Sequence, residues 1–153
     1  MKHIIHFALI TFIAACQPPK DKPTLEEEAV PIEGTWQLLS AETIVGVDTT
    51  FKDYTISMKG IKMLNENHFA FFQHDLTKGV DSTARFVSGG GPYTFESGRY
   101  VEQLEYCTAR QWEGHTFEFE MTLKGDTLVQ EGREKLENLG VDRIIKETYL
   151  RLD

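Results

Sequence analysis

The feature that most constrains the fold is an alternation of apolar and polar side chains in residues 115–123. His115, Phe117, Phe119, Met121 and Leu123 occupy one set of alternate positions, and threonine and glutamate occupy most of the other. Successive side chains of a strand point to opposite faces of a sheet, so this period of two predicts a strand with one buried face. The chain is therefore expected to build its core from half-buried strands.

Two hairpin signals set the expected register of neighbouring strands. A two-residue loop at 125–126, Gly-Asp, would place Leu123 opposite Leu128 and Met121 opposite Gln130, which brings Gln130 onto the apolar face. A second loop at 97–98, Ser-Gly, would place Phe95 opposite Tyr100. The face expected to point inward then comprises Tyr93, Phe95, Tyr100, Glu102, Leu104 and Tyr106. The outward face comprises Thr94, Val101, Gln103, Glu105 and Cys107.

Further strands are expected at 34–45, 51–59, 61–64, 68–74, 84–87 and 143–152, and residues 134–139 could form one helical turn or two. The residues from 32 to 153 suffice for one domain with a core. Many short antiparallel strands predict a sandwich or a closed barrel, and closure removes exposed strand edges. We therefore expect an all-β domain of about eight to ten strands.

The order of several short motifs resembles a known family. Gly34-Thr35-Trp36 resembles the Gly-x-Trp signature of lipocalins, and residues 88–95, 100–106, 114–117 and 125–128 are similar to a lipocalin-like domain of uncharacterised bacterial lipoproteins. The resemblance implies an up-and-down antiparallel β-barrel in which Trp36 closes the base and Arg151 packs over it. Tyr149 stands where such domains would have tryptophan. The family implies no particular substrate.

The first sixteen residues resemble a bacterial lipoprotein signal. A short basic start precedes an apolar run over 4–15, and small residues lead into Cys16. This run is shorter than the roughly 20 residues that a membrane-spanning helix needs, and an ordinary secretory signal is the nearest alternative. The resemblance implies cleavage before Cys16 and a lipid on its thiol. The expected organisation is a signal peptide at 1–15, a lipidated spacer at 16–31 and the barrel at 32–153, in the cell envelope and on the outer membrane, with the leaflet open.

The charge of the chain argues against nucleic acid as a partner. The net charge is −8, and it becomes −9 when residues 1–15, with Lys2 as their one charged side chain, are removed. No basic stripe is present that could neutralise phosphates. Once Cys16 is lipidated, Cys107 is the remaining cysteine, so no disulfide can form within the mature chain. A buried thiol and an oxidisable one both stay open.

Candidate metal ligands and catalytic carboxylates do not converge in the expected strands. His68 and His74 lie six residues apart, about 20 Å along a strand, and His115 belongs to another strand, so no metal site is predicted. Glu102 and Glu105 have an odd spacing, which sends them to opposite faces of a strand. No cofactor is expected.

Other catalytic motifs are weaker still. Residues 89–91 are three glycines without the Gly-Lys-Ser/Thr of a phosphate loop, so we interpret them as a bulge or a barrel bend. No Gly-x-Ser-x-Gly elbow is present. Cys107 with a histidine would be the remaining nucleophile, although the alternation places Cys107 outside. An enzyme is therefore the third hypothesis.

Polar side chains on apolar inward faces suggest two alternatives. A buried polar group without a partner costs about 1–3 kcal/mol, so these groups must bond to one another, to water or to a ligand. They could form a hydrogen-bond network that fills a small barrel, or line a pocket for a small amphipathic molecule. The residues expected to line that pocket are Tyr93, Phe95, Tyr100, Glu102, Tyr106, His115, Phe117, Phe119 and Gln130.

The competing hypothesis is a protein-interaction module, an inhibitor or assembly factor of the envelope that needs no cavity. Its test region would be the loop 108–113, which contains Trp112. The interior volume separates the two hypotheses. A void above about 300 Å³ favours a ligand, whereas a filled barrel with an exposed apolar patch favours a protein partner.

Cys16→Ser tests the predicted anchor. Two or more acyl chains hold a protein on a membrane persistently, because each buried methylene contributes about 0.8 kcal/mol. The variant should therefore move from the membrane fraction to the soluble fraction, as followed by immunoblotting. Continued membrane association of the Cys16→Ser protein would reject lipidation at this residue.

Overall fold

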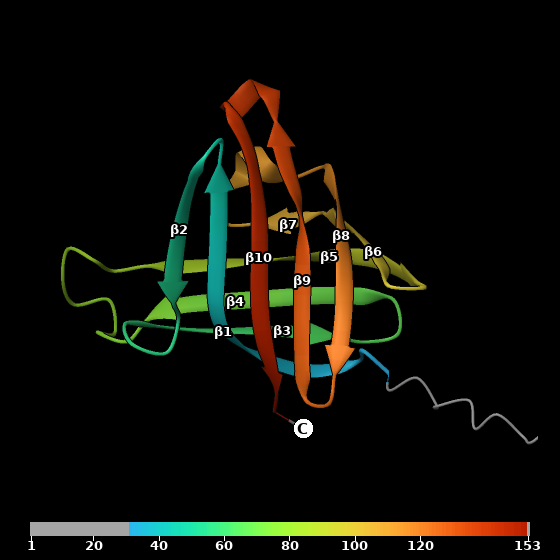
Figure 1. Ribbon diagram of the computed structural model, residues 1–153. Helices are drawn as coiled ribbons and strands as arrows, with labels where there is room; N and C mark the ends of the chain where they lie inside the picture. Colours follow the sequence, from blue (N-terminus) through green and yellow to red (C-terminus); the bar gives the residue numbers. More distant parts are fainter. Residues whose placement is uncertain (1–30, 153) are drawn as a thin grey trace, which may run out of the picture.

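The computed structural model describes residues 31–152, which form a ten-stranded antiparallel sheet with two short 3-10 helices (Figure 1). The predicted signal peptide, the lipidated Cys16 and all of the spacer except Pro31 lie outside the described residues. The strands are β1 Gly34–Val45, β2 Asp48–Asp53, β3 Met58–Leu64, β4 His68–Asp75, β5 Phe86–Glu96, β6 Arg99–Leu104, β7 Tyr106–Cys107, β8 His115–Lys124, β9 Thr127–Leu136 and β10 Val141–Arg151. The 3-10 helices are η1 Arg110–Trp112 and η2 Glu137–Leu139.

Pairing of the first and last strands closes the sheet into a barrel. Eight strands follow one another around it in chain order, and β1 pairs with β10 from Trp36 opposite Arg151 to Ile44 opposite Ile144. β2 adds to one half of β1, and β7 adds to β5. The predicted all-β fold, a closed antiparallel barrel with strands in up-and-down order, is confirmed.

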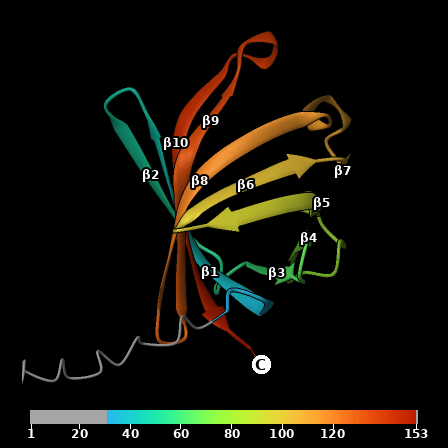
Figure 2. The same ribbon diagram turned by 90° about the vertical axis from the view of Figure 1, so that its right-hand side faces the viewer.

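The strands cross one another in two main directions (Figure 1). β1, β8, β9 and β10 stand upright in that view, and β3, β4 and β5 run across them. β2 diverges from β3 and β4, and it pairs only with β1 among the described strands (Figure 2). The hydrophobic core lies where the strands come together at one end of the barrel. The core around Trp36 includes Leu38, Leu64, Phe69, Tyr93, Tyr100, Met121 and Leu128.

Trp36 and Arg151 close this end of the barrel. Trp36 is fully buried, and its indole N–H donates to the carbonyl oxygen of Ile32 at 2.8 Å. The Arg151 guanidinium lies 4.1 Å from the centre of the indole ring and donates to the carbonyl oxygens of Glu33 (2.8 Å) and Pro31 (2.7 Å). This is the packing that the lipocalin resemblance implies, and it ties the start of the described chain to its last strand.

The two predicted hairpins have the expected register. Phe95 pairs with Tyr100 across the loop 97–98, and Met121 pairs with Gln130 across the loop 125–126. Ser97 and Gly98 both have positive φ values, 51° and 86°, as a two-residue hairpin turn requires. These two turns therefore fix which residues of four strands face the interior.

One predicted strand is wrong. The segment 51–59 does not continue as a single strand, because β2 ends at Asp53 and β3 begins at Met58. The Asp53 carboxylate accepts hydrogen bonds from the backbone N–H (2.7 Å) and the hydroxyl (2.6 Å) of Thr55, which forms an Asx-type turn. The predicted strand at 61–64 is the second half of β3. The expected helical turn at 134–139 is limited to η2, since β9 continues to Leu136.

A bulge between β6 and β7 reverses the predicted faces of Tyr106 and Cys107. β5 pairs Tyr93 with Glu102 and Gly90 with Tyr106, so three residue steps on β5 match four on the partner segment. The extra residue inverts the alternation beyond it. The Tyr106 side chain is therefore 68 % exposed on the outside, and Cys107 faces the interior. Both expectations for these two side chains are wrong for this reason.

The bulge depends on the glycine run at 89–91. A Cβ at Gly91 would collide with the carbonyl oxygen of Gln103 and lie 3.0 Å from the backbone nitrogen of Glu105. Both contacts are backbone atoms, which cannot move aside as a flexible side chain could. The run thus permits close strand approach at the point where the sheet changes register. The glycines themselves pair regularly with β4, and the extra residue of the bulge lies on the β6–β7 side.

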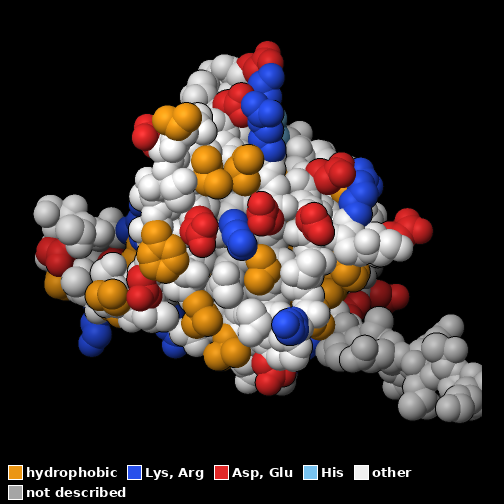
Figure 3. Space-filling view, in the orientation of Figure 1, with side chains coloured by type: hydrophobic (Ala, Val, Ile, Leu, Met, Phe, Trp, Pro, Cys, Tyr) orange, Lys and Arg blue, Asp and Glu red, His pale blue; other side chains and the backbone are white. Residues whose placement is uncertain are grey.

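The outer face of β1, β9 and β10 mixes acidic, basic and hydrophobic side chains (Figure 3). Lys146 approaches Glu131 at 3.7 Å there, and Arg133 pairs with Asp142 at 2.6 Å. Such exposed pairs contribute little to stability. Within residues 31–152 we find no helix with the length and apolar content that crossing a bilayer requires.

Gly91→Ala should destabilise the barrel by about 3 kcal/mol, because the added methyl group meets fixed backbone atoms. Gly125→Ala is the matched control. Gly125 has a φ of 58° but open space around a Cβ, so its variant should lose only about 1–2 kcal/mol of backbone conformational energy. Urea denaturation of both variants measures the difference. Equal losses in the two would contradict the proposed role of Gly91.

Candidate ligand-binding cavity

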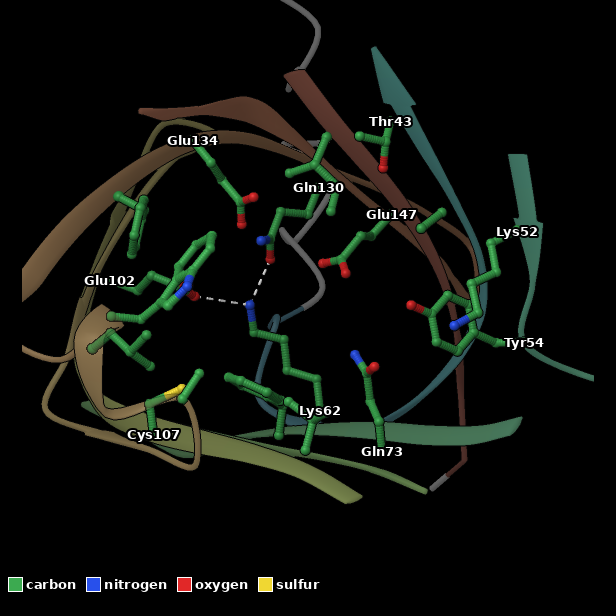
Figure 4. Close-up of a pocket in the computed structure, with 18 of the residues that line it drawn as sticks. Thr43, Lys52, Tyr54, Lys62, Gln73, Glu102, Cys107, Gln130, Glu134 and Glu147 are labelled. Atoms are coloured by element: carbon green, nitrogen blue, oxygen red, sulfur yellow. Dashed lines mark hydrogen bonds and ion pairs between the residues drawn. The ribbon is translucent and has the colours of Figure 1, made fainter. Parts of the chain in front are cut away.

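Away from the closed end, the barrel holds a cavity of about 670 Å³ (Figure 4). Residues of β1, β2, β3, β4, β5, β6, β8, β9 and β10 line it, together with β7 and the loop that carries η1. Apolar and charged side chains both contribute to the lining. The cavity is therefore neither a plain hydrophobic core nor a water-filled polar channel.

The apolar wall comes mainly from β6, β8 and η1. Leu104, Phe117 and Phe119 line the cavity and are buried, at 5 %, 5 % and 3 % exposure. The Trp112 ring lies 5.8 Å from the ring of Phe117, and the Arg143 guanidinium lies 5.5 Å from the Trp112 ring centre. Trp112 is thereby held against its own domain, on the wall of the cavity.

Lys62 forms a buried polar contact on the floor of the cavity. Its side chain is 3 % exposed, and its ammonium group donates to Glu102 Oε2 at 3.0 Å and to Gln130 Oε1 at 2.6 Å. The same nitrogen lies 4.6 Å above the ring of Tyr100 and 5.3 Å from the ring centre of Phe69. The dashed lines in Figure 4 mark this Glu102–Lys62–Gln130 triad. Removing one member of such a buried pair leaves an uncompensated charge.

Glu134 and Arg143 form a second internal ion pair. Arg143 Nε donates to Glu134 Oε2 at 2.5 Å, and both side chains line the cavity. Burial raises the pKa of the Glu134 carboxyl, although the Arg143 charge opposes that rise. The pair joins β9 to β10 near the end of the barrel that carries η2.

Glu147 differs from the other two carboxyls because no cation pairs with it. Among residues 31–152, no lysine, arginine or histidine nitrogen forms an ion pair with this side chain. Its Oε2 accepts a hydrogen bond from the Tyr149 hydroxyl at 2.6 Å, and its carboxyl lines the cavity. Burial raises the pKa of Glu147, and Lys62 only partly opposes the effect. Burial and the neighbouring Glu147 together raise the pKa of Tyr149 well above its ordinary value.

The hydroxyl of Tyr100 is the one fully buried side-chain polar atom in the described part of the chain for which the geometry gives no hydrogen-bond partner. Burial raises its pKa strongly, and the nearby Glu102 charge adds to the rise. Tyr100 therefore stays neutral. Its ring fills the space between Tyr93, 5.2 Å away, and Phe119, 6.3 Å away.

Two cations lie near the rim of the cavity. Lys52 on β2 donates to Met58 Sδ at 3.0 Å, and its ammonium lies 4.5 Å above the Tyr54 ring. Burial and the positive charge of Arg85 lower the pKa of Lys52. Arg85 lies just before β5 and also lines the cavity. Charge at the rim is thus positive, in contrast to the unpaired carboxyl inside.

Four of the residues predicted to line a pocket do so. Glu102, Gln130, Phe117 and Phe119 all line the cavity, because the two hairpin turns fix their faces. The sequence signal that predicted all four is the period-two alternation of apolar and polar side chains.

The other five predicted residues lie elsewhere. Tyr93 and Tyr100 belong to the hydrophobic core but do not line the cavity, and the Tyr93 hydroxyl donates to the carbonyl oxygen of Asn65 at 2.6 Å. Phe95 is 40 % exposed near the end of β5, and Tyr106 points outside beyond the bulge. His115 lies with Nδ1 3.1 Å from the carbonyl oxygen of Trp112, at the edge of the η1 loop.

Sequence reasoning missed several cavity residues, which are Lys62, Cys107, Glu134, Arg143 and Glu147. A signal for Lys62 was present, since Met58, Gly60, Lys62 and Leu64 alternate and all four are buried. On β10, Glu147 lies an even number of residues from Arg151, the residue expected to pack over Trp36. The same alternation would therefore have placed Glu147 on the inner face. A charged residue within an apolar alternation was thus the informative signal. The Cys107 thiol is half-buried, and burial raises its pKa.

Neither potential metal ligands nor the comparisons with known proteins assign a chemistry to this cavity. Within the described range 31–152, no three histidine, cysteine, aspartate or glutamate side chains lie close enough to hold a metal ion. Comparison with protein-family models and with curated proteins found no match to this chain.

Glu147→Gln should stabilise the protein at neutral pH, because it removes a half-buried carboxylate that lines the cavity without a cationic partner. Between the ordinary pKa of 4.5 and the raised pKa, the native chain binds more protons than the unfolded chain, so the free energy of unfolding falls as pH rises. Each unit of raised pKa corresponds to about 1.4 kcal/mol. Urea denaturation at several pH values should show the gain of Glu147→Gln at pH 7 shrinking toward pH 4. Glu120→Gln, an exposed control on β8, should show no such gain, and an identical result for both would exclude the effect.

Proposed function

We propose that this protein binds a small amphipathic molecule inside its barrel. The observation that carries the proposal is the cavity of about 670 Å³, which falls within the range of about 300–1,000 Å³ typical of small-molecule sites. A barrel filled by its own side chains would have favoured the protein-interaction module instead. The cavity is therefore the main support for the ligand hypothesis.

The lining suits a molecule with both an apolar body and a polar group. Phe117, Phe119 and Trp112 offer an aromatic wall, and Lys62, Gln130 and Glu147 project polar atoms from other strands (Figure 4). A few fixed polar groups in a mostly apolar pocket are what orients a ligand and makes binding selective. An amphipathic ligand could use both surfaces at once.

We further propose that the protein is tethered in the bacterial cell envelope, on the outer membrane, through lipid on Cys16. The described chain begins at the closed end of the barrel, where Arg151 holds the carbonyl oxygen of Pro31 at 2.7 Å. The fifteen residues from 16 to 30 would extend over about 45 Å at the rise of a proline-rich linker. Such a tether would leave the far end of the barrel accessible to ligand.

The alternative is a protein-interaction module. It finds some support in exposed apolar side chains on the β1–β2 hairpin and the β4–β5 connection, where Val47 is 97 %, Phe51 63 % and Val80 82 % exposed. However, Trp112, the residue singled out for that role, packs on the cavity wall. The cavity makes ligand binding the better-supported function.

Native mass spectrometry of the protein extracted from its own membrane should detect a retained small molecule. Ala109→Trp should abolish that retention, because Ala109 lines the cavity beside η1 and a large ring there would occupy the ligand space. Thr94→Trp is the control, since Thr94 is exposed on β5 and does not line the cavity. It should retain the molecule at the level of the unchanged protein.

Urea denaturation of Ala109→Trp would show whether the barrel still folds. Equal retention by a folded Ala109→Trp protein would place any bound molecule outside the cavity. A retained protein chain in place of a small molecule would favour the interaction module.

A further inference from the structure

We propose that the ligand of the cavity carries a protonated amine, and that the carboxylate of Glu147 binds it. This inference rests on the proposed ligand-binding function and narrows it to one chemical class, cationic amphipathic molecules. Three observations carry it: the lack of an ion-pair partner for Glu147, the free oxygen of its carboxyl and the pairing of the neighbouring cations with other groups.

Of the three carboxyls that line the cavity, only that of Glu147 lacks an ion-pair partner among the described residues. Glu102 pairs with Lys62 at 3.0 Å, and Glu134 pairs with Arg143 at 2.5 Å. Glu147 has no equivalent partner within residues 31–152. A charge held partly away from water without a partner is costly, so a group of this kind either binds a proton more readily or acquires an opposite charge. The raised pKa of Glu147 is the first of these responses, and a cationic ligand would supply the second.

The geometry of Glu147 leaves room for such a partner. Tyr149 donates to Oε2 at 2.6 Å, and no hydrogen bond to Oε1 occurs in the part of the chain that the structure describes. Figure 4 shows the carboxyl projecting from β10 into the open middle of the cavity, between Gln130 and Tyr54. An ammonium group placed there could donate directly to Oε1.

The groups that face Glu147 from the surrounding strands do not compete for that place. Lys62 on β3 is held by Glu102 and Gln130, and Arg143 is held by Glu134. Tyr54, from the connection after β2, turns its hydroxyl toward Glu147 (Figure 4), and no hydrogen bond joins the two side chains in the described structure. With these two cations engaged in ion pairs, the carboxyl of Glu147 is the one that remains open to an added cation.

The rim presents the opposite charge and defines the main competing class of ligand. Lys52 and Arg85 line the outer part of the cavity, and a fatty acid could place its carboxylate beside them with the chain inside. Arg85 is exposed, where screening weakens its effect. Lys52 already contacts Met58 Sδ and the Tyr54 ring, whereas Oε1 of Glu147 has no partner among the described residues, so the amine should be the preferred head group.

Binding of an amine has a proton balance that distinguishes it from binding of a neutral molecule. When a protonated amine meets a protonated Glu147, the carboxyl releases its proton to solvent as the ion pair forms. No covalent bond changes. Amine affinity should therefore rise with pH through the range in which Glu147 titrates, and titration calorimetry should record proton release in buffers of different ionisation enthalpy.

The test uses three probes of one chain length, decylammonium, decanol and decanoate, with the full chain carrying Cys16→Ser. Calorimetry measures affinity, and Trp112 fluorescence reports occupation of the cavity. Decylammonium should bind most tightly. Glu147→Gln should weaken it about tenfold or more, the loss expected for a charge-assisted hydrogen bond, and leave decanol unchanged. The control Glu120→Gln should alter none of the three affinities.

The possible outcomes separate the two proposals. Tightest binding of decanol or decanoate, or an unchanged decylammonium affinity in Glu147→Gln, would overturn the amine class and leave the cavity as a ligand site. Failure of all three probes to bind a folded protein would overturn the ligand-binding function together with this inference. Because Glu147→Gln is expected to fold more stably at neutral pH, loss of structure would not explain a weaker amine affinity.

Discussion

The pairing of β1 with β10 is the interaction on which the rest of the structure depends. It joins the two ends of the sheet, so strand edges that would otherwise need partners are satisfied within the barrel. At one end of this seam Trp36 is fully buried beneath the Arg151 guanidinium, 4.1 Å from its ring centre. The hydrophobic packing at that end lets the other end remain hollow, because the cavity walls are continuous with strands that are already fixed below. A solid base and an open interior are thus consequences of the same closure.

Charged groups inside the cavity lower the stability of the barrel, and the fold does not require them. Hydrophobic residues of similar volume often replace buried ion pairs without loss of stability, and the unpaired Glu147 is more costly than a paired carboxyl. Strained or destabilising groups of this kind concentrate at functional sites, where stability is exchanged for activity. The interior of this barrel contains two compensated carboxyls, Glu102 and Glu134, and one that is not. This imbalance, rather than the cavity alone, is what points to a class of ligand.

Much of the fold could be predicted from the sequence, and the failures have local causes. Alternation and two-residue turns are short-range signals, so they placed Glu102 and Gln130 on the inner face correctly. The bulge beyond Leu104 depends on how closely the glycines of β5 approach the segment that joins β6 to β7. No local sequence pattern contains such a long-range contact, and the bulge reverses the faces of Tyr106 and Cys107. The charged lining was missed for a different reason, since inward-facing charges look like solvent-exposed ones until the strand register is known.

The barrel holds one carboxyl without a cationic partner in its interior, that of Glu147. Carbon-13 NMR of glutamate side chains, recorded from pH 3 to pH 9, measures the pKa of this carboxyl directly. We predict a carboxyl resonance that titrates above the ordinary glutamate range and is absent from Glu147→Gln, and its pKa should fall when decylammonium saturates the protein. If the carboxyl of Glu147 titrated at its ordinary value and did not respond to the amine, Glu147 would not be the unpaired internal group described above.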